Sequence, residues 1–488
     1  MPVLLVVDNP KQWPLGKPGV KVVSAREYVS DPTYNPQGGI KVFNLCRSYA
    51  YKSLGYYVSL LGEARGHRPQ PGVTTIQDLK SPGIVRVMTQ DLDDLVQRSL
   101  RAVKSEQFVL SVYFGRNLAS RYDRLASKLF AMFPAPLLRA HFARKGEAWQ
   151  LKGLGAIPLS EVPEHHLLFL VEAADEYLGR KRWSSRGPEP ARFDLAILHD
   201  PEEEEPASHE DAIRKFVRAA EKVGFNVDVI GKEDIARLPE FDALFIRVTT
   251  SVNHYSYRFS RRAAAEGLVV IDDPVSISRC MNKVYLAQRL YNHQVPMPES
   301  LIVHKGNREE VAARVGLPCI LKQPDSSFSM GVFKVETEEE LKAGLDKLLD
   351  ESELVIAQEF VPTEFDWRVG ILDGKPLYVS RYHMARGHWQ IVNQRVRGGR
   401  RYGKVETIPW EDAPRRVVRL ALKAAELMGK GLYGVDVKQV KGRCLVIEVN
   451  DNPTIEAGDE DQVLKDELYE RIMRVFLERV EARKSKGH

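Results

Sequence analysis

Apolar and polar positions along the chain predict three successive regions of mixed helix and strand. In the first region, apolar runs at residues 3–8 and 108–114 predict strands, and residues 41–65 have the spacing of an amphipathic helix. Helical patterns then extend to about residue 140. Because strands and helices are mixed without a regular alternation, we expect an N-terminal α+β domain over residues 1–180.

The second region begins after a segment of turn-forming and charged residues, 181–192, which predicts a linker. Strands and helices then alternate, beginning with a strand at Phe193–Leu198. Ser208 and Asp211 have the spacing of a capping box at the start of the next helix. The alternation predicts a small βαβ layer over residues 193–280.

The third region, residues 281–480, contains a predicted hairpin at 434–453 whose apolar strands include three oxygen-bearing side chains. A basic tail follows the region at 481–488. Glu448 and Asn450 are two residues apart and therefore face the same way. A three-residue loop at 441–443 would place Asp436 directly opposite Glu448.

Three such oxygen donors predict a Mg²⁺ site that nucleotide phosphates and water would complete, with Mn²⁺ as a substitute. The alternative is a solvated hairpin with exposed acids. The acids interrupt runs of valine and isoleucine that have the character of a core, which favours the metal site.

A predicted phosphate-binding segment precedes this hairpin. Lys322 ends an apolar strand and is followed by a loop of serine and glycine that includes Ser327 and Gly331. Such a placement directs a positive charge and backbone N–H groups at phosphate oxygens, although a strand-end lysine is by itself most often solvated. Asp366 and Arg368 alternate on a later strand and share a face, where a simple surface ion pair is the alternative.

Composition excludes several classes of protein. The 488 residues, 43% of them hydrophobic, are enough for two to four globular domains. No apolar run reaches the length of roughly 20 residues that spans a bilayer, so we expect a cytoplasmic protein without membrane association. The four cysteines are scattered, and the acidic run at 202–205 is expected to be a solvated surface.

Charge is modest over the whole chain, at +5, but residues 381–404 contain seven basic residues and no acid. A solvated loop is the simplest interpretation. The same charge would attract an acidic substrate, and Arg400 and Arg401 are the candidates to bind it. A third interpretation is nucleic-acid binding, with Trp389 and Tyr402 as stacking surfaces, but it leaves the carboxylate hairpin unexplained.

The order of motifs along the chain resembles the RimK-like ATP-grasp carboxylate–amine ligases. The motifs are Asn282-Lys283, Ile320-Leu-Lys322, Ser326-Ser-Phe-Ser-Met-Gly331, Ile356-Ala-Gln-Glu-Phe360, Asp366-Trp-Arg368, Gly434-Val-Asp436 and Ile447-Glu-Val-Asn450. Residues 47–67 resemble the N-terminal domain that is fused to some of these proteins. The resemblance implies an ATP-grasp fold that follows the βαβ layer and the N-terminal domain.

The resemblance also implies site residues. Arg368 and Arg381 are the expected catalytic residues, and Asp436, Glu448 and Asn450 the metal ligands. The expected ATP-binding residues are Lys283, Lys322, Ser327, Gly331, Gln358, Glu359, Phe360, Asp366 and Asn393.

The implied reaction is ATP-dependent formation of an amide or peptide bond through an acyl phosphate. The expected substrate is glutamate, another acidic amino acid, a peptide or a protein terminus. The alternative within the same fold is a kinase that phosphorylates a small molecule. Sequence leaves open whether the protein forms a homo-oligomer.

Overall fold

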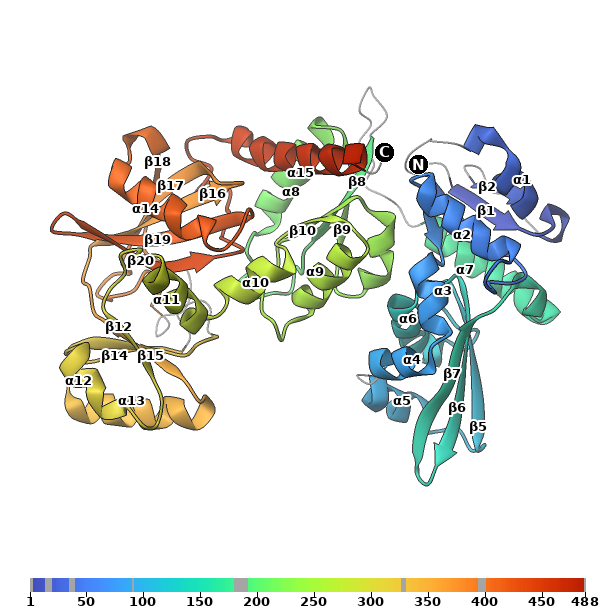
Figure 1. The fold of residues 1–488 in the computed structure, drawn as a ribbon, viewed down its shortest axis with the longest axis horizontal. Helices are drawn as coiled ribbons and strands as arrows, with labels where there is room; N and C mark the ends of the chain where they lie inside the picture. The colour runs from blue at the N-terminus through green and yellow to red at the C-terminus, as the bar shows by residue number, and fades with distance from the viewer. Residues whose placement is uncertain are drawn as a thin grey trace. The chain divides into compact units, whose positions relative to one another are not determined.

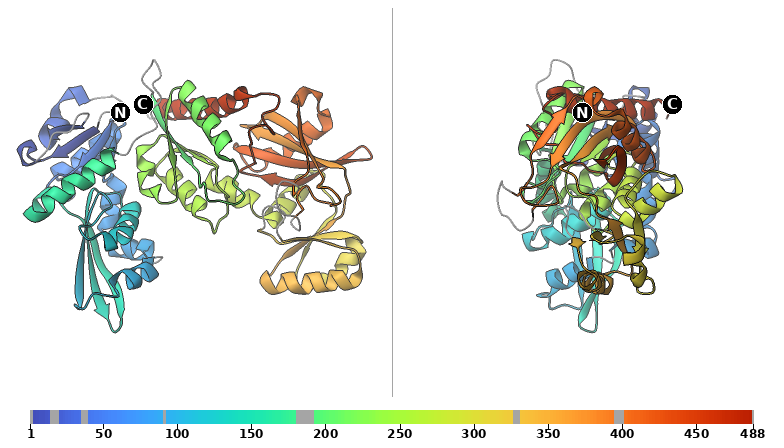
Figure 2. Two further views of the ribbon diagram at one scale, coloured as in Figure 1. Left: turned by 180° about the vertical axis from the view of Figure 1, so that it is seen from behind. Right: turned by 90° about the vertical axis from the view of Figure 1, so that its left-hand side faces the viewer.

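A computed structural model describes residues 3–13, 20–34, 40–89, 92–179, 192–325, 331–393 and 401–486 (Figures 1 and 2). The predicted linker therefore lies almost entirely outside the described residues. The chain divides into two compact units. The first contains Met1–Ser184 together with Glu233–Glu240, and the second contains Ser185–Lys232 and Phe241–His488.

The first unit contains a parallel sheet and an antiparallel sheet. The parallel sheet has the order β2-β1-β3-β4 and the antiparallel sheet the order β5-β6-β7. The strands are β1 (Val3–Val7), β2 (Val20–Ser24), β3 (Lys41–Asn44), β4 (Arg68–Gln70), β5 (Gln107–Tyr113), β6 (Leu137–Lys145) and β7 (Ala148–Ala156). The helices are α1 (Ala25–Ser30), α2 (Leu54–Ala64), α3 (Val73–Leu79), α4 (Pro82–Thr89), α5 (Asp93–Leu100), α6 (Asp123–Met132) and α7 (Leu167–Gly179).

Two predicted boundaries in this unit are wrong. Residues 41–65 are not one helix, because Lys41–Asn44 form the buried strand β3 and α2 begins only at Leu54, capped by Ser53. A buried parallel strand is apolar on both faces, so a short run of this kind cannot be told from a helix by periodicity. Helical structure also does not extend to residue 140, since β6 begins at Leu137.

The second unit begins with a parallel sheet of order β11-β10-β8-β9. Its elements are β8 (Phe193–Leu198), α8 (Glu210–Lys222), β9 (Phe225–Ile230), β10 (Ala243–Ile246), α9 (Tyr255–Ala265), β11 (Val269–Ile271) and α10 (Pro274–Cys280). The C-terminal helix α15 (Asp466–Lys486) lies beside α8 and shares its core with this sheet (Figure 1). Residues 481–486, expected to form a tail, therefore continue a helix.

The predicted capping box at Ser208 is absent. His209 is the N-cap residue of α8, and its side chain makes no capping hydrogen bond. The Ser208 hydroxyl instead donates to the carbonyl oxygen of Ile455 at 2.8 Å and accepts from the buried Arg247. The serine therefore links the parallel sheet to the segment that follows the C-terminal hairpin.

Two antiparallel sheets complete this unit. The four-stranded sheet has the order β12-β15-β13-β14 and the five-stranded sheet the order β18-β17-β16-β19-β20. The strands are β12 (Ser300–Val303), β13 (Cys319–Lys322), β14 (Val332–Val335), β15 (Val355–Glu359), β16 (Phe365–Leu372), β17 (Lys375–His383), β18 (Val405–Ile408), β19 (Leu432–Val440) and β20 (Arg443–Asn450). The helices are α11 (Lys283–Asn292), α12 (Val311–Arg314), α13 (Glu338–Glu351) and α14 (Arg415–Glu426).

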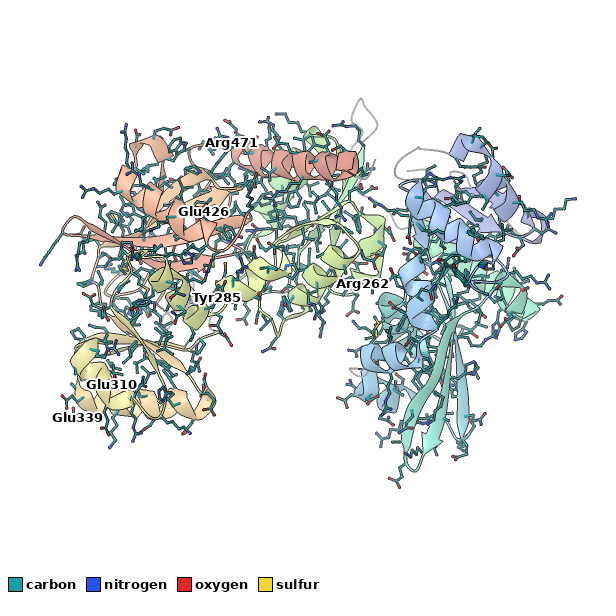
Figure 3. All side chains as sticks on the ribbon, viewed as in Figure 1. Arg262, Tyr285, Glu310, Glu339, Glu426 and Arg471 are labelled. Carbon is teal, nitrogen blue, oxygen red and sulfur yellow. The ribbon has the colours of Figure 1, made fainter. Side chains whose placement is uncertain are left out.

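Each antiparallel sheet has one face covered by helix. Leucines of α13 pack on the four-stranded sheet, and α14 packs on the five-stranded sheet. The exposed Glu310 and Glu339 project from helical segments on the outer side of the four-stranded sheet (Figure 3). The opposite faces of the two sheets are left to form a site. None of the described helices combines the length and apolar character needed to cross a bilayer.

The C-terminal hairpin has the predicted pairing but a different turn. Asp436 lies opposite Glu448, as expected. The turn has two residues, Lys441 and Gly442, both with positive φ, rather than three. A register shift between Asp436 and Val437 supplies the missing offset, which aligns the two acids.

Candidate active site

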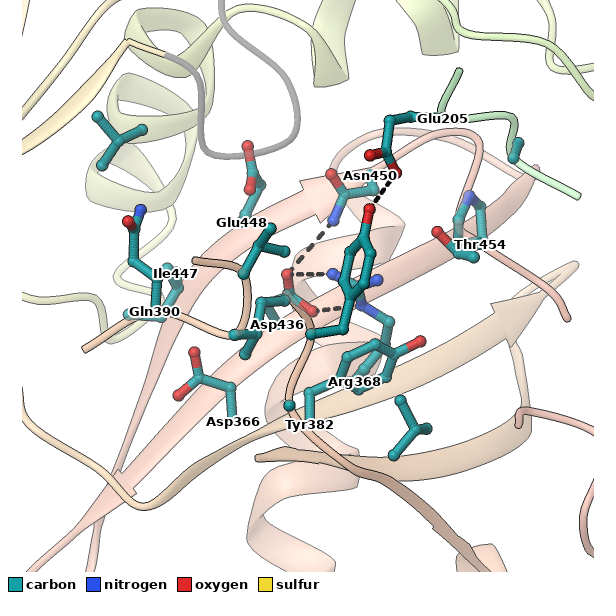
Figure 4. A pocket seen from close by; sticks show the side chains of 18 of the residues that line it. Glu205, Asp366, Arg368, Tyr382, Gln390, Asp436, Ile447, Glu448, Asn450 and Thr454 are labelled. Atoms are coloured by element: carbon teal, nitrogen blue, oxygen red, sulfur yellow. Dashed lines mark hydrogen bonds and ion pairs between the residues drawn. The ribbon is translucent and has the colours of Figure 1, made fainter. Parts of the chain in front are cut away.

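A cavity of about 830 Å³ lies within the second unit, and most of the predicted site residues line it (Figure 4). This volume is within the range of pockets that hold nucleotide-sized ligands. The predicted residues on its wall are Lys283, Lys322, Gln358, Glu359, Phe360, Asp366, Arg368, Arg401, Asp436, Glu448 and Asn450. Residues that are distant in sequence are thus collected from both antiparallel sheets and α11.

Three cation–carboxylate pairs mark one part of the wall, which we call the paired half. Lys283 Nζ lies 3.2 Å from Glu448 Oε1. Arg368 donates two hydrogen bonds to Asp436, at 2.7 and 2.8 Å. This fork geometry fixes both side chains, and it replaces the Asp366–Arg368 surface pair that was the alternative from sequence.

The third pair joins Lys438 Nζ to Asp366 Oδ1 at 2.6 Å. Thr363 donates a further hydrogen bond to the same oxygen. Sequence analysis did not select Lys438, although its position two residues after Asp436 on one strand was a usable signal. The three pairs place equal numbers of positive and negative side chains at this part of the cavity.

Burial and neighbouring charges together set the pKa values of the side chains in this half. Burial opposes the ionisation of Glu448, but Lys283 and Lys322 outweigh it and lower the pKa of Glu448 below its ordinary value. Burial also lowers the pKa of Lys322 to about 8. Burial disfavours the charged form of Arg368, yet the adjacent Asp436 raises its pKa further, so this guanidinium stays protonated.

Lys322 lies at the end of β13, where its Nζ donates a hydrogen bond to Gln358 Oε1 at 2.8 Å. Gly331, which follows the loop after Lys322, has φ +68°, and a Cβ there would contact the side chain of Gln323. The positive φ favours glycine at this position. Ser327 lies outside the described residues.

The predicted metal ligands fit a hard divalent cation. Asp436, Glu448 and Asn450 line the same cavity, and Asn450 Nδ2 lies 3.5 Å from Asp436 Oδ2. Each carboxylate has more acceptor positions than its salt bridge occupies, and the amide of Asn450 could turn its oxygen inward. Within the described ranges, no group of three His, Cys, Asp or Glu has metal-binding geometry, so the candidate set depends on this amide.

Aromatic side chains form one end of the cavity near the end of β15. The ring of Phe360 meets that of Trp389 edge to face at 5.9 Å, and Lys334 Nζ lies 4.5 Å from the centre of the Phe360 ring. The backbone N–H of Glu359 donates a hydrogen bond to the carbonyl oxygen of Glu299 at 2.8 Å. The arrangement offers apolar surface and strand-edge hydrogen bonds to a flat ring system.

Other predicted residues lie elsewhere. Arg381 lies 3.5 Å from Glu406 and packs over the ring of Trp367. It pairs with Trp367, whereas Arg368 pairs with Ser380, so the side chains of Arg381 and Arg368 lie on opposite faces of the five-stranded sheet. This placement does not support a catalytic role for Arg381. The backbone of Asn393 binds the carbonyl oxygen of Arg401, and Asn393 is not among the residues that line the cavity.

The predicted substrate arginines are only partly described. Arg400 lies outside the described residues. Arg401 lines the cavity, and its guanidinium lies 2.6 Å from Glu205 Oε1, so it is already paired with an acid. Glu205 also accepts a hydrogen bond from the hydroxyl of Tyr402. The acidic run at 202–205 is therefore not simply a solvated surface, since Glu204 and Glu205 reach the cavity.

Sequence analysis missed a second set of acids, which we call the acidic half. They come from the loop before α8 and from the segment after the hairpin: Glu204, Glu205, Asp451, Glu456, Asp459 and Glu460. Glu205 and Thr454 lie on one side of Asn450 and Asp366 on the other in Figure 4. Burial raises the pKa of Glu460 to about 7. The dense acids between residues 456 and 461 were the available signal.

Comparison with known proteins gives matches over both units. Residues 25–173 match the RimK-like ATP-grasp N-terminal domain, and residues 280–474 match the RimK-like ATP-grasp domain.

Two relatives at about 25% identity are both named probable alpha-L-glutamate ligase. A probable alpha-L-glutamate ligase of Vibrio vulnificus is 26% identical over 233 residues, 47% of this chain and 74% of that protein. One of Marinomonas sp. is 25% identical over 272 residues, 52% of this chain and 87% of its own. A solved D-alanine–D-alanine ligase of Bacillus anthracis covers 61% of this chain and 100% of its own at 15% identity, with a TM-score of 0.48.

Proposed function

We propose that this chain, which belongs to the RimK-like ATP-grasp family and is an ADP-forming C–N ligase, activates the carboxylate of glutamate or of an acidic peptide and joins it to an amine. The observation that carries the proposal is the paired half. Lys283, Arg368 and Lys438, each beside a carboxylate, line one cavity with the buried Lys322. Glutamate is taken from the names of the relatives.

The chemistry has two steps. A carboxylate oxygen of the acid substrate attacks the γ-phosphorus of ATP, the bond from that phosphorus to the oxygen of ADP breaks, and an acyl phosphate forms. The amine then attacks the acyl carbon, phosphate leaves with the former carboxylate oxygen, and the amine nitrogen loses a proton. No nucleophilic side chain is needed, because phosphorylation supplies the leaving group.

The cationic side chains stabilise the charge that develops on the transferred phosphoryl group. Lys322 lies at the end of β13, where it donates a hydrogen bond to the neutral side chain of Gln358, and Lys283 can exchange Glu448 for a phosphate oxygen. Arg368 is held by Asp436, so its position is set before substrate binds. Asp436, Glu448 and Asn450 would hold Mg²⁺, which would supply charge neutralisation at the phosphates.

The aromatic end of the cavity supports adenine binding. Phe360 and Trp389 provide an apolar wall where β15 ends. Trp389 therefore packs inside a cavity and Tyr402 bonds to Glu205, which removes the support for these residues as stacking surfaces for nucleic acid.

The test is a screen of the full chain for phosphate release with ATP, Mg²⁺ and pairs of amino acids, followed by mass spectrometry. A ligase yields ADP, phosphate and a product lighter than its two substrates together by one water. A kinase would yield ADP and a phosphorylated product without free phosphate. Detection of that phosphorylated product would overturn the proposal in favour of the alternative within this fold.

A further inference from the structure

The acidic half of the cavity carries more negative charge than its described surroundings balance. Its six acids are Glu204, Glu205, Asp451, Glu456, Asp459 and Glu460. The cations near them are Arg401 and Lys404 on the wall and the buried Arg247, which interacts with Glu456 and Glu460. Among the described residues, Glu205 is the one of the six that forms a salt bridge with arginine or lysine. The paired half shows the opposite pattern, with a cation at each of three acids.

Two of these acids are buried and bonded only to neutral groups. Glu460, 1% exposed, accepts hydrogen bonds from the hydroxyl of Tyr382 and from the backbone N–H of Glu456. These donors hold the carboxylate in place, and the buried Arg247 is a cation that interacts with both Glu460 and Glu456. A buried carboxylate in this setting favours a cationic partner, because an unpaired buried charge is costly.

Asp451 gives an independent sign of a missing partner. It is 3% exposed, lines the cavity, and its Oδ2 has no hydrogen-bond partner among the described residues. Buried carboxylate oxygens are nearly always bonded, so an orphaned one on a cavity wall marks a place for a donor. Asp451 directly follows Asn450, which puts this place beside the site where the acyl phosphate would form.

We propose that the acidic half binds the amine substrate, and that this substrate has two cationic groups, as a diamine or a dibasic amino acid does. Asp451 and Glu460 recognise its ammonium groups. The inference rests on the proposed function and names the second substrate of that reaction. It also separates the two substrates by charge, since the acidic substrate would be repelled from this half.

The amine enters as an ammonium ion, whose charge-assisted hydrogen bonds to a carboxylate are stronger than neutral ones. The reacting nitrogen loses one proton before attack, which the Asp451 carboxylate can accept, and a second proton after the C–N bond forms. A free amino acid such as glutamate would bring its own carboxylates next to buried acids. Like charges at such distances oppose binding, so glutamate is disfavoured as the amine at this position.

The experiment is calorimetric titration of the full chain, loaded with ADP and Mg²⁺, with two ligands of equal length. 1,5-Diaminopentane and pentylamine differ only in the second ammonium group. We expect the diamine to bind at least about tenfold more tightly than pentylamine, because one additional charged contact contributes this much to affinity. Equal affinities for the two ligands would overturn the inference, whether or not turnover has been found.

Two variants locate the effect. Glu460→Gln and Asp451→Asn keep the shape of each side chain and remove its charge, and each should cut the preference for the diamine about tenfold. Glu202→Gln removes an exposed charge of the same acidic run that does not line the cavity, and should leave the preference unchanged. A preference for the diamine that survives both cavity variants, shown folded by circular dichroism, would also overturn the inference.

A ligation assay separates this inference from the proposed function. Failure to form any amide while the charge-dependent preference persists would remove the function and keep the cationic site. Amide formation with alanine or glutamate as the better amine would keep the function and remove the dicationic substrate.

Discussion

The two halves of the cavity differ in the partners that they give to buried carboxylates. In the paired half, Asp436 and Glu448 each lie beside a protein cation, and Lys283 helps to lower the pKa of Glu448. In the acidic half, burial raises the pKa of Glu460 to about 7, with neutral donors as its partners. A site that already contains its counter-charges suits anionic phosphates that exchange with those charges, whereas a site that lacks them suits a ligand that brings its own.

Removing one charge from the paired half should have the largest expected effect, a loss of turnover. Glu448→Gln deletes the partner of Lys283 and one proposed ligand of Mg²⁺, so we expect turnover to fall by about a hundredfold or more with the protein still folded. Steady-state release of phosphate at saturating ATP and Mg²⁺ measures this. Glu309→Gln, at an exposed glutamate outside the cavity, is the matched control. Full activity of Glu448→Gln would remove the metal assignment.

Breaking a buried pair should also destabilise the fold. Arg368 and Asp436 have side chains only 11% and 13% exposed, and Arg368→Met leaves Asp436 buried without its cation. We expect a loss of about 3 kcal/mol in the free energy of unfolding, measured with urea. Arg471→Met removes the partner of Glu467 from an exposed helix pair and should change stability by less than about 0.5 kcal/mol. Equal effects would contradict the distinction between buried and exposed pairs.

The pKa of Lys322, about 8, predicts a pH-dependent affinity for ATP. The ammonium form, which binds phosphate, predominates below pH 8 and is lost above it. We therefore expect the dissociation constant of ATP to rise about tenfold between pH 7 and pH 9. Lys322→Arg keeps its charge over this range and should flatten the curve. A wild-type affinity that is level across this interval would show that Lys322 does not contact the nucleotide.

The smallest expected effect is on melting temperature, and it is a gain in stability on removing the charge of Glu460. Burial raises its pKa from 4.5 to about 7, so the folded protein holds a proton that the unfolded chain releases, and stability falls as pH rises between those values. Glu460→Gln should therefore raise the melting temperature by a few degrees at pH 8, with the gain disappearing below pH 4.5. Differential scanning fluorimetry across pH tests this. A variant that melts below the wild type at pH 8 would show that the charge is compensated.

Much of the paired half could be predicted from sequence, because strand alternation fixes which side chains share a face. Asp436, Glu448 and Asn450 were found in this way, although the aligning offset came from a register shift and not from the turn. Lys438 follows the same rule and was overlooked.

The acidic half could not be assembled from sequence patterns. Its members come from a loop near residue 204 and a segment near residue 456, which Arg247 and Ser208 join through contacts between side chains and backbone. Local periodicity contains no information about such a contact. The error at β3 has a different cause, since a four-residue buried strand is too short for its period to be read.

The most direct test of the central claim follows the oxygen of the acid substrate. Glutamate labelled with ¹⁸O in both carboxylates is incubated with the full chain, ATP, Mg²⁺ and 1,5-diaminopentane, or with a mixture of amino acids as amines, and the released phosphate is analysed by mass spectrometry. Activation through an acyl phosphate predicts one ¹⁸O atom in each phosphate and one fewer in the amide than in the acid. Phosphate without ¹⁸O, formed together with an amide, would contradict the account.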